Sequence, residues 1–277
     1  MRLLLFVPVL LVVQGCQVTL QPYRLQHPAI AIATTPQNGP AIVPVKADQD
    51  CVTATVPICL AFLEVDDMGE FWDKGELDTA LSVIRRANRD AHADPVVLTF
   101  VHGWKNNAAP DNSNVAGFKV ALQDIYARLQ GKRPVIGIYI GWRGNLIRPT
   151  WPVAQQFSYY NREAAATRIP GAGLSSALTQ IAVRTHENPR ALAIFIGHSF
   201  GGLLLERAIS EATASEIAQA NLYAQEAAAL PAGSAEATEK LRLATAAPDA
   251  RADLVIFINP AGAATEAKPM LDFLAEN

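Results

Sequence analysis

The sequence predicts an α/β fold in which a mostly parallel sheet carries helices on both faces. Continuous apolar runs at 58–63, 96–101, 135–140, 191–196 and 254–258 are typical of strands that are buried on both sides. Segments with apolar residues at helical spacing alternate with these runs, as in strand–helix–strand units. The chain has 277 residues, half of them hydrophobic, which is enough to bury the core of one such domain.

Two amphipathic helices are predicted between these strands. Leu77, Leu81 and Ile84 recur at helical spacing, and arginines follow where the helix dipole favours cations. A second helix is predicted over 115–129, after a polar start at 112–114. Each helix is expected to pack on the sheet.

The apolar run at 191–196 continues into a G-x-S-x-G motif, Gly197-His198-Ser199-Phe200-Gly201. A serine on so sharp a strand-to-helix turn takes a strained backbone conformation, and the two glycines remove side chains that would collide there. The hydroxyl is then exposed above the sheet, and the N–H of Phe200 at the helix start is free to face an anion. The motif predicts Ser199 as a nucleophile and Phe200 as an oxyanion donor.

The run at 96–101 is followed at once by His102-Gly103-Trp104. Gly103 leaves room for a substrate beside the strand end. The backbone N–H of Trp104 is predicted as the second donor of an oxyanion hole. His102 is assigned to this loop.

These motifs together resemble the α/β-hydrolase superfamily, and in particular its bacterial serine-hydrolase or esterase-like branch. The resemblance covers about residues 58–275, and its markers are Phe100-Val101-His102-Gly103-Trp104, Gly141-Trp142-Arg143-Gly144, residues 197–202 and Ile258-Asn259-Pro260-Ala261. It implies an α/β-hydrolase-type sheet and hydrolysis of an ester or related acyl bond through an acyl-enzyme at Ser199. We expect no cofactor and no metal, because no His/Asp/Cys cluster has ligand spacing.

The residues that would activate Ser199 are not apparent. The superfamily orders its triad as Ser, then Asp or Glu, then His, but all five histidines precede Ser199. His198 is expected to point away from its neighbour. Asn259 stands where pancreatic-type lipases carry Asp, and an amide cannot balance an imidazolium charge. We expect Asn259 on the same rim of the sheet as Ser199.

Three explanations fit this gap, in order of preference. A C-terminal part is missing, the site is divergent, or the protein is a non-catalytic hydrolase-fold lipoprotein that binds a ligand or partner at the cell envelope. The run at 254–258 would form an apolar edge strand if the sheet ended there, which natural sheets avoid. The chain as given is expected to have weak or no esterase activity.

Residues 1–16 have the pattern of a lipoprotein signal peptide. A charged start and an apolar stretch too short to span a bilayer precede Gly15-Cys16, which predicts lipidation at Cys16. An ordinary secretory signal is the alternative. Because Gln17 rather than Asp follows the cysteine, the expected location is the cell envelope, lipid-anchored at the outer membrane and facing the periplasm.

Residues 17–50 are rich in Pro, Gln and Thr and predict a flexible tether to a domain over 51–277. Cys51 and Cys59 form an even pair in an oxidising compartment, and both a disulfide and two buried thiols fit. The aromatic residues within 142–173 would either roof the site or fill the core.

The net charge of −3 and the lack of a basic, aromatic-rich run argue against a nucleic-acid partner. The expected partners are a small-molecule ester or lipid substrate, and the membrane through the N-terminal lipid.

Overall fold

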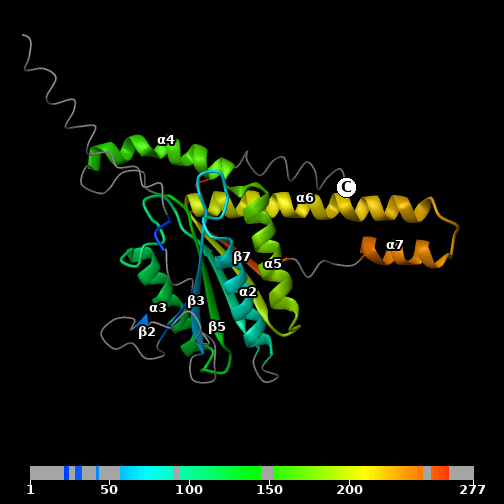
Figure 1. Ribbon diagram of the computed structural model, residues 1–277, viewed down its shortest axis with the longest axis horizontal. Helices are drawn as coiled ribbons and strands as arrows, with labels where there is room; N and C mark the ends of the chain where they lie inside the picture. Colours follow the sequence, from blue (N-terminus) through cyan, green and yellow to red (C-terminus); the bar gives the residue numbers. More distant parts are fainter. Residues whose placement is uncertain are drawn as a thin grey trace, which may run out of the picture.

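The computed structural model describes residues 22–24, 29–32, 42–43, 57–89, 94–144, 152–245 and 251–261 (Figure 1). The strands are β1 (Ala29–Ile32), β2 (Ile42–Val43), β3 (Ile58–Glu64), β4 (Val96–Val101), β5 (Val135–Gly141), β6 (Leu192–His198) and β7 (Leu254–Ile258). The helices are α2 (Lys74–Asn88), α3 (Ser113–Arg128), α4 (Pro152–Arg168), α5 (Ser175–His186), α6 (Phe200–Ala228) and α7 (Ala235–Thr245), with a π-helical turn η1 (Pro170–Leu174) before α5.

The strands form one sheet in the order β2-β1-β3-β5-β4-β6-β7. From β3 to β7 all neighbours are parallel, whereas β1 is antiparallel to β3 and β2 to β1. The predicted α/β class and the mostly parallel sheet are therefore confirmed. Parallel strands place their carboxyl ends on one rim, where β4, β5, β6 and β7 all end.

Helices cover both faces of the sheet, as expected (Figure 1). Helices α2 and α5 and the first turns of α6 pack on one face, in a core that includes Leu63, Ile84 and Phe195. Helix α3 packs on the other face through Phe118 and Leu122. Burial on both sides explains why β3 and β5 are apolar without alternation.

Helix α3 begins where the sequence predicts. The Asn112 side chain accepts a hydrogen bond from the Asn114 N–H at 2.9 Å and so caps the helix. The helix ends before Gly131, whose φ of 70° suits a residue without a side chain.

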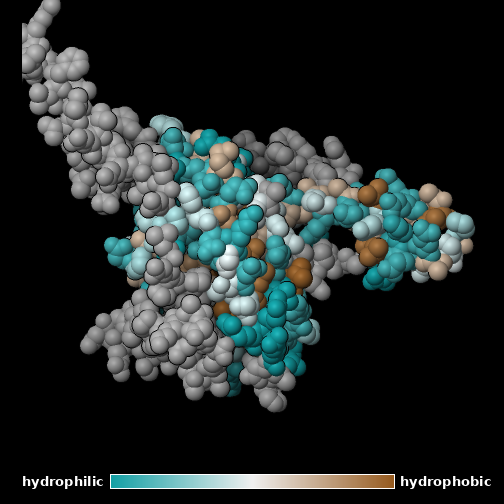
Figure 2. Space-filling model, in the orientation of Figure 1, coloured by the Kyte–Doolittle hydropathy of each residue, from teal (hydrophilic) through white to brown (hydrophobic). Residues whose placement is uncertain are grey.

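Helix α6 is much longer than the sheet requires. Its start is buried in the core, but none of residues 209–245 is buried. Figure 1 shows α6 extending beyond the sheet and α7 folding back beside it. We call residues 210–245 the arm. Figure 2 shows apolar residues scattered among hydrophilic ones on it, and Leu222 and Leu241 are about half exposed.

The predicted tether over 17–50 is corrected in part. Residues 29–32 and 42–43 belong to the sheet, and β1 pairs with β3. The Glu64 carboxylate also accepts the backbone N–H groups of Tyr23 and Arg24 at 2.8 and 2.7 Å. The Arg24 guanidinium lies 3.5 Å from the centre of the Phe62 ring. Parts of this segment therefore extend the domain that was expected to begin at residue 51.

Other N-terminal predictions lie outside the described residues. These are the signal peptide over 1–16, the lipidated Cys16, and Cys51. Cys59 is fully buried on β3 and takes part in a disulfide bond, which is one of the two alternatives left open by the sequence.

Candidate active site

Ser199 has the strained backbone that the G-x-S-x-G motif predicts. Its φ of 54° and ψ of −123° are unusual for a residue with a side chain, and such conformations cost about 1–3 kcal/mol. Neighbouring segments hold it in place. The Ser199 N–H donates to the Ile258 carbonyl at 3.0 Å, and the Ser199 carbonyl accepts the Gly202 and Ala261 N–H groups at 2.9 and 3.1 Å.

The glycines of the motif sit where no side chain fits. A Cβ on Gly201 would lie 2.1 Å from the carbonyl oxygen of Val101, at the end of β4. A Cβ on Gly197 would lie 2.7 Å from the carbonyl oxygen of Gly201. Contacts this short do not occur in folded proteins. The strand-to-helix turn over 197–201, which we call the elbow, therefore forms only with glycine at these positions.

The structure brings the loop after β4 against the serine. A Cβ on Gly103 would lie 2.8 Å from both the Ser199 Cβ and the His198 carbonyl oxygen. Phe200 is the first residue of α6, so its N–H has no carbonyl partner within the helix. The two motifs that the sequence places about a hundred residues apart are thus in contact.

His102 is fixed and neutral. It is fully buried, and its Nε2 accepts the Trp142 backbone N–H at 3.0 Å, so the hydrogen on its ring is on Nδ1, 2.9 Å from the Gly103 carbonyl. The ring also stacks on those of Trp142 and Tyr139. Burial lowers the pKa of His102 to about 4. With both nitrogens engaged, His102 cannot take a proton from Ser199.

This histidine predicts a pH dependence of stability. An unfolded histidine has a pKa near 6.5, so its contribution is present above that pH and is lost as the pH falls toward about 4. The loss amounts to about 3 kcal/mol at most. Urea unfolding at pH 7 and pH 4.5 should show wild type losing more stability on acidification than His102→Gln.

Comparing wild type with His102→Gln cancels the contributions that other titrating groups make to the pH dependence of stability. Burial raises the pKa of Glu76 to about 8, so its contribution to stability grows as the pH falls from about 8 toward 4.5. That effect is common to wild type and His102→Gln and cancels in their difference. Equal pH dependence in both proteins would contradict a buried, neutral His102.

His198 differs from His102. Its Nδ1 is buried and has no hydrogen-bond partner within the described part of the chain. The atom lies beside Gly103, whose added Cβ would be 3.1 Å from it. His198 therefore adjoins the loop after β4 as well as the elbow.

His186 forms an acid–histidine pair that the sequence does not suggest. Its Nε2 lies 3.1 Å from the Asp253 Oδ2, which also accepts the Ala193 N–H at 2.7 Å. The pair lies at the start of β6 and β7, whereas Ser199 follows the end of β6. About five residues of strand, or roughly 17 Å, separate them, so this pair cannot serve Ser199.

Asn259 lies on the predicted rim. It directly follows β7, which is parallel to β6 with His198 opposite Ile258. Its φ of 43° marks a sharp turn of the chain. Among the described strands β7 is at the sheet edge, and Leu254 and Ile258 are about half exposed.

The described aromatic residues of 142–173 lie in the core or at the rim. Trp142 is buried and donates from its indole Nε1 to the His102 carbonyl at 2.7 Å. Tyr159 on α4 contacts the rings of Trp104 and Phe200, with centroid distances of 5.2 and 5.1 Å. Tyr160 beside it is 76% exposed. Helix α4 therefore crosses the rim next to the elbow.

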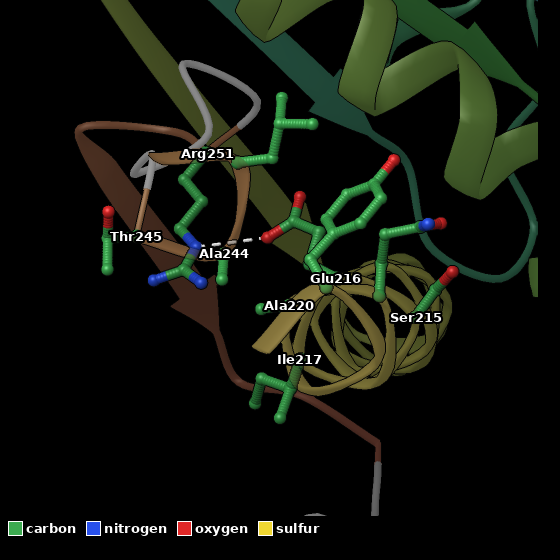
Figure 3. A pocket seen from close by; sticks show the side chains of 10 residues that line it. Ser215, Glu216, Ile217, Ala220, Ala244, Thr245 and Arg251 are labelled. Atoms are coloured by element: carbon green, nitrogen blue, oxygen red, sulfur yellow. Dashed lines mark hydrogen bonds and ion pairs between the residues drawn. The ribbon is translucent and has the colours of Figure 1, made fainter. Parts of the chain in front are cut away.

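A cavity of about 400 Å³ lies elsewhere, at the base of the arm (Figure 3). It is lined by residues of α6 and α7 and by Arg251, whose Nε pairs with the Glu216 Oε2 at 3.1 Å. Ser215 on its wall is 16 residues along α6 from Ser199, or roughly 24 Å. This cavity does not belong to the elbow.

No protein-family model, curated protein or solved structure matches this chain. Within the described ranges, no group of three or more His, Cys, Asp or Glu side chains is arranged to hold a metal ion. The helices of those ranges include none with the length and hydropathy needed to cross a bilayer.

Proposed function

We propose that the protein is a serine hydrolase of the α/β-hydrolase type that cleaves an ester or related acyl bond. The observation that carries the proposal is the conformation of Ser199 between β6 and α6. Strain of this kind persists only where surrounding contacts impose it, and it clusters at active sites. Ser199 also lies on the rim where ligand sites of parallel sheets gather.

In this proposal, Ser199 Oγ attacks the carbonyl carbon of the substrate. An Oγ–carbon bond forms, the carbon–oxygen bond of the ester breaks, and the proton of Ser199 ends on the leaving oxygen, which departs as an alcohol. Water then hydrolyses the acyl-enzyme, which releases the acid and restores the serine hydroxyl. The backbone N–H groups of Phe200 and Trp104 would stabilise the negative oxygen of the intermediate. His102 and Gly103 would position the loop after β4 that carries the Trp104 N–H, because the Trp142 N–H donates to His102 and holds it in place.

Binding of a ligand or partner without catalysis is a second candidate function, and the positions of two histidines favour it. Both nitrogens of His102 are occupied, and the His186–Asp253 pair is at the far rim. A protein that keeps the elbow without a base would bind a ligand or partner and not turn it over. Under either function, lipidation at Cys16 would hold the domain in the cell envelope, at the outer membrane and facing the periplasm.

Covalent labelling of Ser199 by a fluorophosphonate tests the proposal. We expect one label per chain at Ser199, with formation of an Oγ–phosphorus bond and release of fluoride, and no label in Ser199→Ala. Hydrolysis of p-nitrophenyl acetate should be weak, because His102 has both ring nitrogens bonded and His186 lies at the far rim.

Ser215→Ala is the matched control, because Ser215 is an exposed serine on the same helix, outside the elbow. Its labelling should equal that of wild type. Labelling that survives Ser199→Ala, or a wild-type protein that takes no label, would exclude Ser199 as the nucleophile.

A further inference from the structure

Helix α4 is fixed over the rim by a cluster of charges around the buried Arg162. Arg162 is 1% exposed, and its two terminal nitrogens bind the Asp67 carboxylate at 2.7 and 2.9 Å. Arg162 also donates to the Arg143 carbonyl at 2.8 Å, and the Arg143 side chain pairs with Asp67. Asp67 follows β3 and Arg143 follows β5, so the cluster ties α4 to two strand ends. We call these three side chains the α4 clamp.

Apolar packing holds the same C-terminal half of the helix. Ala165, Ala166 and Ile169 are fully buried in the core. Displacing α4 would expose this apolar surface and leave Arg162 without its carboxylate. Helix α4 is therefore a fixed element of the site and not a hinged cover.

Tyr159 lies one helical turn before Arg162, and its ring contacts the rings of Phe200 and Trp104. Its ring is tilted by 44° against Phe200, the residue after Ser199, and meets Trp104 edge-on at 85°. Trp104 in turn follows Gly103, which adjoins the Ser199 Cβ. Phe200 is fully buried, whereas the rings of Tyr159 and Trp104 that pack next to the elbow are partly exposed.

We propose that Tyr159 is the specificity-determining residue of the site and restricts it to substrates with a short acyl chain. This inference rests on the proposed function. A group bound to Ser199 would lie beside the Tyr159 ring, whose helix is held by the α4 clamp and whose side chain is held by its packing on Trp104 and Phe200. A long acyl chain would have to displace that ring, whereas an acetyl-sized group would not.

The experiment compares the rates at which an ethyl and a decyl fluorophosphonate label Ser199. Wild type should react at least about tenfold faster with the ethyl probe, a preference worth about 1.4 kcal/mol. Tyr159→Ala should bring the ratio of the two rates close to one. Tyr159→Phe keeps the ring and should keep the wild-type ratio.

Tyr160→Ala is the matched control, because Tyr160 is the next residue of the helix and is largely exposed. Its ratio should equal that of wild type. Tyr159→Leu fills more of the space than alanine and serves if Tyr159→Ala does not fold by circular dichroism. It should also lower the ratio, though less.

The outcomes separate the two proposals. A wild-type ratio in the folded Tyr159→Ala or Tyr159→Leu protein would overturn the role of Tyr159 while leaving Ser199 as the nucleophile. An equal change in Tyr160→Ala would overturn it as well. Absence of labelling by either probe in wild type would refute the proposed function, and the role of Tyr159 with it.

Discussion

Replacing Gly201 with alanine is expected to destabilise the protein by about 3 kcal/mol. The added Cβ would lie 2.1 Å from the Val101 carbonyl oxygen and 2.5 Å from that of His102. These are backbone atoms of β4 and its loop, and they cannot rotate away as a side chain would. Helix α6 would have to move off the end of β4, which loosens the packing of Leu204 and Ala208 in the core.

Urea unfolding of Gly201→Ala and Gly117→Ala measures this effect against a control. Gly117 lies within α3 on its exposed side, and a Cβ there would meet nothing within 4 Å. Alanine favours the helix more than glycine does, so Gly117→Ala should stabilise by about 1 kcal/mol. A Gly201→Ala protein as stable as wild type would contradict the close contact between α6 and β4.

Replacing Asp67 with asparagine is expected to cost about 3 kcal/mol of stability, because the change leaves the buried Arg162 without a compensating charge. Burial alone would raise the pKa of Asp67, but hydrogen bonds and charges from Arg162 and Arg143 outweigh it and lower the pKa. The carboxylate is therefore ionised near neutral pH. Its contribution should fade as the pH drops toward that lowered pKa.

Asp66→Asn is the control for this prediction. The Asp66 Oδ1 accepts the N–H groups of Met68 and Glu70 at 2.8 and 3.0 Å, and an amide oxygen can accept them too. We expect a change within about 0.5 kcal/mol. Equal losses of stability in the two variants, measured by urea unfolding at pH 7, would show that the α4 clamp does not depend on the Asp67 charge.

The parts of the fold that the sequence predicts are those determined locally. The parallel strands are continuous apolar runs, and the elbow is a short motif whose first glycine, Gly197, is required by contacts within a few residues. Asn112 caps α3 by a bond to a residue two positions away. Such features need no knowledge of the tertiary structure.

The features that the sequence does not reveal depend on distant partners. Tyr23 and Arg24 dock because Glu64, about 40 residues later, presents a carboxylate to their N–H groups. Arg162 is buried in a helix because Asp67, 95 positions away, neutralises it. Polar residues in an irregular or mixed segment carry no periodic signal for such pairings.

For the candidate site, too, the sequence predicts the locally determined features and misses those that depend on distant partners. The motifs predict the turn at Ser199 and its position after a strand end, and the strand order predicts the rim position of Asn259; the structure has both. The sequence does not distinguish Tyr159 from the other aromatic residues of 142–173. Its contacts with Trp104 and Phe200 depend on where α4 crosses the rim.

The hydrogen bonds between the elbow and the last described strand also order the events of folding. The Ser199 N–H needs the Ile258 carbonyl, and the Ser199 carbonyl needs the Ala261 N–H, both roughly 60 residues later in the chain. A ribosome adds about 5–20 residues per second, so these bonds form at least about 3 s after Ser199 is made. Until then β6 has an open edge, and pairing with β7 must close a loop that contains the whole arm. The strained serine is thus acquired late, when the rest of the sheet can already support it.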